Sequence, residues 1–377
     1  MEANRFGSLF FIAPGFLGAL FCSALLVLIP SCKKDGQTPD WDTPGESLPT
    51  AESGAGSGIS ASAEVEQKPV VNPTEDAAAE APEEEIGVGR DLKPAGEPLE
   101  GASTTGLRFM AYNVENWLTM DRYVDNKQLK DAAKPDAEKK AAIELIARHV
   151  PDVLGLCEIG TREDLLEIQE ALKAAGVDLP NLHYSGGSDP VRHLGLLSRF
   201  PITGTATVKE STFRIDGTEY SFNRGVLDAT VEARGKNYRF LGVHLKSKRE
   251  VEDGDQELMR QGEARLLRKH VDSIFEADAE ARLVVYGDFN DTRPSPSFRT
   301  VTGSYNDPKY LTAIPAKDSR GHAWTHHWNP HDIYSRIDFV TVSRVLRAEV
   351  DFDKSYLVDD EEWSVASDHR PLVAIFK

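Results

Sequence analysis

From residue 107 to the end of the chain, short apolar runs alternate with polar turns. Apolar runs rich in β-branched and aromatic side chains, and bounded by Gly, Pro, Asn or Asp, are typical of β-strands. The pattern predicts strands at residues 107–112, 153–157, 194–197, 238–243, 283–286, 337–342 and 372–376.

Between these strands, apolar residues spaced three and four positions apart predict helices. The predicted helices cover residues 137–149, 162–175 and 255–277. Thr161 is a candidate N-cap for the second helix, with Asp164 three positions on, and Gly176 ends it. Strands and helices in this order predict one α/β domain over residues 107–377.

The start of the chain has a different pattern. Residues 8–30 are apolar and follow Arg5, and the run closes at Cys32. This layout resembles a bacterial lipoprotein signal over residues 1–32, with Cys32 lipidated as the mature N-terminus. The expected location is the cell envelope, exported and membrane-anchored. The alternatives are a single-span membrane anchor, since about 20 apolar residues can cross a bilayer, or secretion.

Residues 33–106 are rich in Pro, Gly, Ala and Glu and show no sustained apolar period. A segment of this composition cannot bury enough apolar surface to fold, so we predict a disordered acidic tether.

Charge is distributed unevenly along the 377 residues, whose net charge is -18. The tether carries 16 acidic and 5 basic residues, whereas residues 107–377 carry 44 acidic and 37 basic ones. The domain is therefore mildly acidic, which excludes a basic protein that coats nucleic acid. A polyanionic substrate would need a local basic patch or a metal ion. The three cysteines do not form a disulfide framework, because only Cys157 lies in the domain.

Polar residues suited to metal binding and acid–base chemistry lie at the ends of several predicted strands. Those that follow a strand are Asn113, Glu115, Glu158, His244, Asp288, Asn290 and Asp291. Asp338 lies near the start of a strand, and Asp368 and His369 precede the last one. Singly, each has a structural explanation, because Asn and Asp form turns and a buried histidine can be structural. Glu158 continues an apolar strand, where an unpaired charge is costly, so a metal or a donor is expected beside it. Together these residues predict a site assembled from strand ends.

The same blocks carry a family resemblance. The ordered set MAYNVEN, LCEIG, HLGLLSRFPI, RGVL, VHLKS, YGDFND, SRIDFV and SDHRPL resembles the endonuclease/exonuclease/phosphatase superfamily, and in particular its deoxyribonuclease-like, secreted bacterial members. The resemblance spans residues 107–377. It implies a four-layered α/β sandwich of two mixed sheets flanked by helices, with the site along one sheet edge.

The resemblance also implies a metal site and a phosphate site. Glu158 is the implied main ligand of a divalent cation, with Asn113 and Asp368 near the metal or its waters. Arg224, in RGVL, and Asn113 would contact the substrate phosphate. Oxygen ligands suit Mg²⁺, with Mn²⁺ or Ca²⁺ as substitutes.

The implied catalytic residues act on water and on the leaving group. His369 would be the general base, oriented by Asp338. Asp288 and Asn290 would position the attacking water and the phosphate. His244 would donate to the leaving oxygen or to a phosphate oxygen. The family leaves open which group activates the water.

Departures from the family patterns narrow the substrate. The sequence Glu158-Ile159-Gly160 argues against apurinic-site endonucleases, and the SRID block argues against inositol polyphosphate phosphatases. HLKSK resembles the block of secreted nucleases, although Val243 stands where they often have Asn. Lys246, Lys248, Arg249 and the bases of the third helix would bind a nucleic-acid backbone, unless the helix charges face solvent.

The leading hypothesis is an exported, metal-dependent phosphodiesterase, a nuclease of low specificity. We expect nucleic acid as substrate, a membrane contact through the lipid anchor, no protein partner and a monomer. One alternative is a sphingomyelinase-like or other phosphoester hydrolase. The other is an inactive module that binds a phosphorylated ligand or a protein.

Overall fold

The computed structural model describes residues 105–124, 127–249 and 254–377. The predictions for the signal segment, for Cys32 and for nearly all of the tether lie outside these residues. Within the described ranges, no helix has the length and apolar character needed to cross a bilayer. The first described strand begins at Leu107, where the sequence pattern changes.

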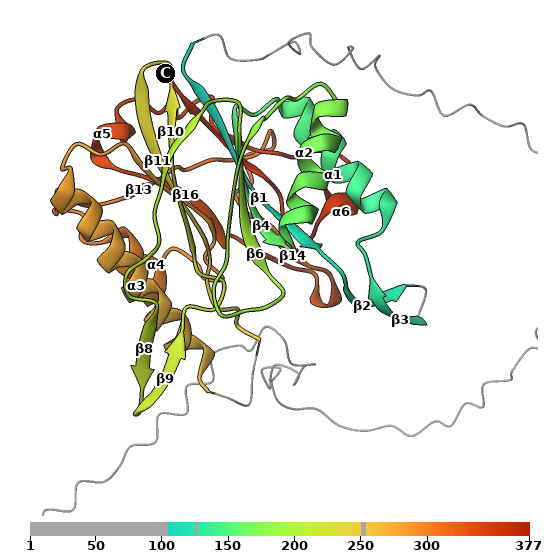
Figure 1. Cartoon of the computed structure of the whole chain (residues 1–377), viewed down its shortest axis with the longest axis horizontal. Helices are drawn as coiled ribbons and strands as arrows, with labels where there is room; N and C mark the ends of the chain where they lie inside the picture. The colour runs from blue at the N-terminus through green and yellow to red at the C-terminus, as the bar shows by residue number, and fades with distance from the viewer. Residues whose placement is uncertain (1–104, 125–126, 250–253) are drawn as a thin grey trace, which may run out of the picture. The chain divides into compact units, whose positions relative to one another are not determined.

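Two six-stranded sheets form the centre of the domain (Figure 1). The first has the order β17 (Tyr356–Leu357), β18 (Leu372–Phe376), β1 (Leu107–Trp117), β4 (Val153–Ile159), β6 (His193–Ser198), β5 (Asn181–Ser185). The second has the order β13 (Thr312–Ala313), β16 (Asp338–Val342), β12 (Leu283–Asp288), β11 (Lys236–His244), β10 (Val226–Ala233), β7 (Ile202–Thr205). Both are mixed, because β1–β4 and β11–β12 are parallel pairs among antiparallel neighbours.

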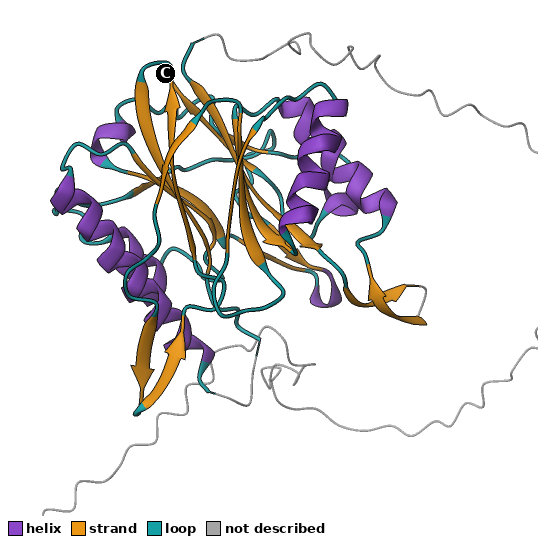
Figure 2. Ribbon diagram, in the orientation of Figure 1, coloured by secondary structure: helices purple, strands orange, loops and turns teal. Residues whose placement is uncertain are grey.

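Helices cover the outer faces of both sheets, which gives four layers (Figure 2). On the first sheet lie α1 (Asp136–His149), α2 (Arg162–Ala174) and α6 (Trp363–Ala366); on the second lie α3 (Gln256–Ala277) and α4 (Pro296–Thr302). The short helices α5 (Arg344–Arg347) and η1 (Asn329–His331) connect strands. One apolar core fills the space between the sheets and one lies under each helical layer. This is the four-layered sandwich expected from the sequence.

All seven predicted strands and three predicted helices are present within a few residues. Thr161 and Asp164 form the predicted capping box at the start of α2. Apolar β10 and the shorter, more polar strands were not predicted. The latter include three hairpins: β2 (Met120–Val124) with β3 (Lys127–Ala132), β8 (Thr212–Ile215) with β9 (Thr218–Ser221), and β14 (His326–Trp328) with β15 (Ile333–Ser335). Short strands with little apolar alternation give only a weak sequence signal.

The two sheets approach closely at Gly155 of β4. A Cβ at this position would overlap the buried ring of Tyr286 on β12. We expect Gly155→Ala to lower the free energy of unfolding by about 1–3 kcal/mol, because the ring has no free space to enter. Denaturant unfolding of Gly155→Ala, with and without Tyr286→Leu, measures this effect. The smaller Leu side chain should reduce the cost of the added methyl group.

Gly204→Ala on β7 is the matched control, because its Cβ would meet nothing closer than 3.9 Å. Equal stability of the Gly155→Ala and Gly204→Ala variants would contradict this account of the sheet contact.

Candidate active site

The site lies where the inner faces of the sheets change from apolar to polar side chains. On β12, Val284 and Tyr286 belong to the core between the sheets, and Asp288 is the next residue on the same face. On β16, Val340 belongs to that core and Asp338 precedes it on the same face. The two aspartates are directly opposite in the β12–β16 register. On both strands, every second side chain points between the sheets, and this series passes from core residues to the aspartates of the site.

Two further strands add polar residues in the same way. On β11, Phe240 lies in the inner core, and His244 ends the same face, opposite Asp288 in the parallel register. On β1, Phe109 and Ala111 lie in the inner core, and Asn113 follows them. Strands from both sheets thus bring these side chains to one end of the domain.

Glu158 reaches the site through an irregularity in β4. Leu154 and Leu156 pack in the core under α1 and α2, and strict alternation would send Glu158 there too. Instead the pairing of β4 with both neighbours shifts between Cys157 and Ile159, and Glu158 has a φ of 67°. This bulge turns the carboxylate toward the cavity while Ile159 keeps its place in the core.

The Glu158 carboxylate is held by two donors. The backbone N–H of Asn116 donates to Oε2 at 2.8 Å, and the side-chain nitrogen of Asn113 donates to Oε1 at 3.1 Å. The same Asn113 nitrogen lies 3.3 Å from Asp288 Oδ2 and 3.4 Å from His369 Nε2. The Asn113 oxygen accepts from the Glu115 N–H at 3.1 Å. Asn113 therefore fixes Glu158 relative to the other polar groups, and its ligation of a metal stays a prediction.

His369 and Asp338 form a buried pair. Nδ1 of His369 donates to Asp338 Oδ2 at 2.8 Å, and Nε2 faces the cavity. Burial alone would lower the pKa of His369, but the carboxylates of Asp338 and Asp368 outweigh burial and raise this pKa well above its usual range. Asp338 fixes Nδ1, so that the other ring nitrogen is directed away from this carboxylate. A cation bound by the neighbouring carboxylates would offset the charge that raises this pKa, so that Nε2 could be neutral and accept a proton.

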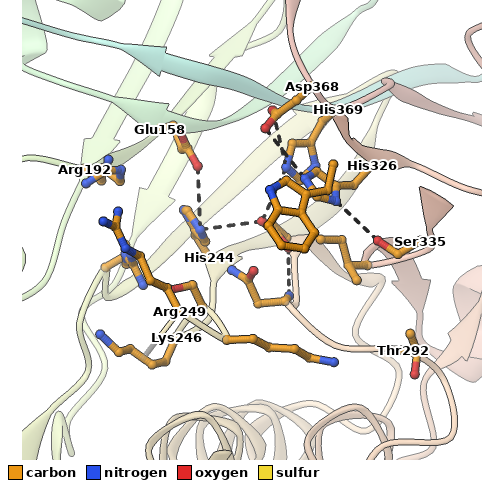
Figure 3. A pocket seen from close by; sticks show the side chains of 17 residues that line it. Glu158, Arg192, His244, Lys246, Arg249, Thr292, His326, Ser335, Asp368 and His369 are labelled. Carbon is orange, nitrogen blue, oxygen red and sulfur yellow. Dashed lines mark hydrogen bonds and ion pairs between the residues drawn. The ribbon is translucent and has the colours of Figure 1, made fainter. Parts of the chain in front are cut away.

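His244 is fully enclosed and close to two carboxylates. Its Nε2 lies 3.6 Å from Asp288 Oδ2 and 3.9 Å from Glu158 Oε1; the contact with Glu158 is drawn in Figure 3. Burial and the positive charges of Arg224 and His369 lower the pKa of His244 well below its usual range. His244 is therefore neutral at neutral pH, and its ring keeps one N–H to donate.

Asp288 and Asn290 form a tight turn after β12. Oδ1 of Asp288 accepts the Asn290 N–H at 2.7 Å, and the Asn290 side chain donates to the Leu245 carbonyl at 2.9 Å. Burial and the nearby Asp338 raise the pKa of Asp288 to about 7. The turn fixes both side chains beside the two histidines.

These residues border a cavity of about 550 Å³. Arg192, Lys246 and Arg249 lie on one side, and His326, Ser335, Asp368 and His369 lie on the other (Figure 3). Arg224 and Lys248 also line the cavity. Among the described residues, Nη1 of the buried Arg224 has no hydrogen-bond acceptor, and its Nε lies 3.3 Å from Asp189 Oδ2. Arg224 lines the cavity, and a buried guanidinium nitrogen without a partner is suited to an anion.

Part of the basic surface expected on α3 is absent. Arg260 is buried and pairs with Asp291 at 3.1 Å, and Arg268 pairs with Asp272 and donates to the backbone around α4. These two bases are structural, because each pairs with a carboxylate and neither lines the cavity. Lys248 does line the cavity, 3.2 Å from Asp291.

The structure brings the predicted residues together. Glu158, His244, Asp288, Asn290, Asp368, His369 and Arg224 all border the cavity, and Asn113 and Asp338 bond to them. Asp368 lies 3.8 Å from Nε2 of His369 and 3.7 Å from Nε2 of His326, and its ligation of the cation expected at Glu158 stays a prediction. Sequence reasoning missed Arg192 and His326. The histidine pair in WTHHW was the signal for His326, but its proximity to the site depends on the β14–β15 hairpin.

The carboxylates around the cavity have the chemistry of a cation site. Burial, together with the nearby Asp368, raises the pKa of Glu115 to about 7, as burial and Asp338 do for Asp288. Burial is the largest cause of both shifts and a neighbouring carboxylate the next, so a bound cation would favour the ionised form of each group. Carboxylate and amide oxygens around a cavity fit a hard divalent cation.

Several solved structures share this fold. An endonuclease/exonuclease/phosphatase from Bacteroides vulgatus is 19% identical, with a TM-score of 0.51 and coverage of 72% of this chain and 99% of that chain. Beta toxin from Staphylococcus aureus is 17% identical, with a TM-score of 0.50 and coverage of 72% and 100%. The human Nocturnin catalytic domain is 18% identical, with a TM-score of 0.50 and coverage of 72% and 94%. At these identities the similarity shows the fold alone.

A comparison with the curated proteins finds no match to this sequence. The model of the Endonuclease/Exonuclease/phosphatase family matches residues 112–369, which is more than half of the chain and contains every site residue described above. The two mixed sheets, the helical outer layers and the family match agree, and the chain belongs to the Endonuclease/Exonuclease/phosphatase family, a family of phosphoester hydrolases.

Proposed function

We propose that this protein is a metal-dependent phosphodiesterase that cleaves nucleic acid with low sequence specificity. The observation that carries the proposal is the cavity itself. It joins the Asp338–His369 pair and the Glu158 carboxylate to the unpartnered guanidinium nitrogen of buried Arg224. A base, a cation site and an anion-binding group are the three parts that hydrolysis of a charged phosphodiester requires.

The chain's own residues divide the chemistry as follows. Asp338 holds His369 so that Nε2 can accept a proton from water. Arg224 binds a non-bridging phosphate oxygen. His244, neutral through burial, donates its N–H to the leaving oxygen or to a phosphate oxygen. The Asp288–Asn290 turn positions the water between the histidines.

Glu158 is the residue best placed to hold a divalent cation. Asp288 lies close to it, because the side-chain nitrogen of Asn113 contacts both carboxylates. A cation bound there would neutralise the charge of the phosphate and of the surrounding carboxylates. We propose Mg²⁺, because the possible metal ligands at this position are mostly carboxylate oxygens.

The basic side of the cavity favours nucleic acid over a single phosphoester. Arg192, Lys246, Lys248 and Arg249 extend the positive charge beyond Arg224. A single phosphoester needs one anion-binding site. A nucleic-acid backbone carries a phosphate at every nucleotide, so several neighbouring cations increase its affinity. Because the domain carries more acidic than basic residues, these local cations are what attract the strand.

The test is a substrate panel for the full chain: supercoiled plasmid, RNA, sphingomyelin vesicles and a phosphate monoester, each with Mg²⁺ and with a chelator. We expect the protein to convert supercoiled plasmid to relaxed plasmid in the presence of Mg²⁺. With the chelator the cleavage rate should be at least about 100-fold lower, because the charge on the phosphate is then not neutralised. If lipid is hydrolysed while plasmid and RNA stay intact, the nuclease hypothesis is wrong and a sphingomyelinase-like enzyme is supported. If no substrate is cleaved in a metal-dependent way, the alternative of an inactive binding module is supported.

A further inference from the structure

A second group of metal-binding side chains lies on the side of the cavity opposite the basic residues. His326 begins β14 and pairs with His369 as an isolated antiparallel bridge. The centroids of the two imidazole rings are 4.6 Å apart. Asp368, directly before His369, completes the group.

Both histidines have one ring nitrogen already engaged. Nδ1 of His326 lies 3.3 Å from the Ser335 hydroxyl, and Nδ1 of His369 lies 2.8 Å from Asp338 Oδ2. Each Nε2 faces Asp368, at 3.7 Å from Oδ2 for His326 and 3.8 Å from Oδ1 for His369. A histidine that ligates a metal through one nitrogen commonly has its other nitrogen bonded to an oxygen in this way.

The ligand atoms are close enough to bind one ion. One donor atom from each of His326, Asp368 and His369 lies within 4.8 Å of the others. Tetrahedral ligands at bond lengths of about 2.1 Å are roughly 3.4 Å apart. The two distances between a histidine nitrogen and an Asp368 oxygen, 3.7 and 3.8 Å, are close to this value. His326 and Asp368 are partly exposed and all three line the cavity, so an ion can reach them.

The chemistry of this group differs from that of the Glu158 side. Two imidazole nitrogens and one carboxylate suit Zn²⁺ and other late transition metals, whereas Mg²⁺ prefers oxygen ligands. In a second triplet, Asp288, Asp338 and His369, one ligand atom from each residue also lies within 4.8 Å of the others, but all three residues are buried and Asp338 already holds Nδ1 of His369. The partly exposed triplet is therefore the better transition-metal site.

We propose that His326, Asp368 and His369 form a second cation site that binds Zn²⁺ or a similar transition metal. An ion held there takes the lone pair of His369 Nε2, the atom that accepts the proton from water. Zn²⁺ binding therefore inhibits phosphodiester hydrolysis supported by Mg²⁺. The inhibition rests on the proposed function, whereas the binding of the ion does not.

The binding test uses the full chain with Zn²⁺, and with Co²⁺ as a visible-absorption probe, in excess Mg²⁺. Calorimetric titration compares the wild type with His326→Gln and with the matched control His327→Gln. His327 is the adjacent residue, and its Nε2 pairs with Asp332 outside the cavity lining. We expect Zn²⁺ affinity to fall at least about tenfold in His326→Gln, since a ligand is lost, and to stay unchanged in His327→Gln. Equal affinity in the wild type and in His326→Gln would overturn the site.

The activity arm separates this proposal from the proposed function. Zn²⁺ should inhibit plasmid cleavage by the wild type and by His327→Gln at concentrations near the measured Kd, and His326→Gln should need at least about ten times more. Tight Zn²⁺ binding that leaves cleavage unaffected would overturn the inhibition. If the wild type cleaves no substrate, calorimetry and the Co²⁺ spectrum still decide whether the site exists, and the proposed function alone fails.

Discussion

Replacing His369 with asparagine is expected to lower kcat for plasmid cleavage by about 10²–10⁴-fold, the usual contribution of a general base. The Asn side chain can still donate to Asp338 in place of Nδ1, which lies 2.8 Å from that carboxylate. It has no nitrogen corresponding to Nε2, so the proton acceptor is lost while the buried carboxylate keeps its partner. Initial rates at saturating Mg²⁺ and plasmid measure the effect.

Two comparisons make this result specific to the base. His322→Asn is the control, because the His322 side chain is 57% exposed and absent from the cavity lining; it should cleave like the wild type. Asp338→Asn should also lose activity, and the double variant with His369→Asn should be little worse than His369→Asn alone, since the two residues act as one unit. A folded His369→Asn variant within about threefold of the wild-type kcat would contradict the role of His369.

Glu158→Gln is expected to raise the Mg²⁺ concentration for half-maximal cleavage by at least about tenfold, since loss of a direct ligand should cost at least as much as loss of a group that only hydrogen-bonds to a ligand. The substitution keeps the size of the side chain. It also keeps an oxygen that can accept the Asn116 N–H, which in the wild type donates to Oε2 at 2.8 Å. The charge that would hold the cation is removed. Cleavage rates across a Mg²⁺ titration, and Mn²⁺ binding followed by electron paramagnetic resonance, measure the change.

Glu167→Gln serves as the matched control. Glu167 pairs with Lys139 at 2.8 Å and accepts from the Trp117 ring, away from the cavity lining. Its loss should leave the Mg²⁺ dependence unchanged. If Glu158→Gln and the wild type show the same Mg²⁺ dependence and the same Mn²⁺ affinity, the cation is held elsewhere, and Asp288 becomes the first position to test.

The pattern of apolar runs was enough to predict the main strands and helices of the domain. Apolar runs bounded by turn signals located the strands, and the capping residues of α2 are encoded within four consecutive positions. The inner-face positions of Asp288, Asp338 and His244 follow from the two-residue period of a strand. Such signals are local, so they can be recognised before any long-range contact is known.

What the tertiary structure alone decided is the convergence of these strand ends and the direction of the side chains that depart from the period. Glu158 would face α2 if β4 were regular, and only the bulge with φ of 67° turns it to the cavity. His326 lies 43 positions before His369, and the β14–β15 hairpin brings their rings within 4.6 Å. The chain encodes which residues carry the chemistry through local patterning, but their distances depend on long-range strand pairing, which a one-dimensional pattern does not contain.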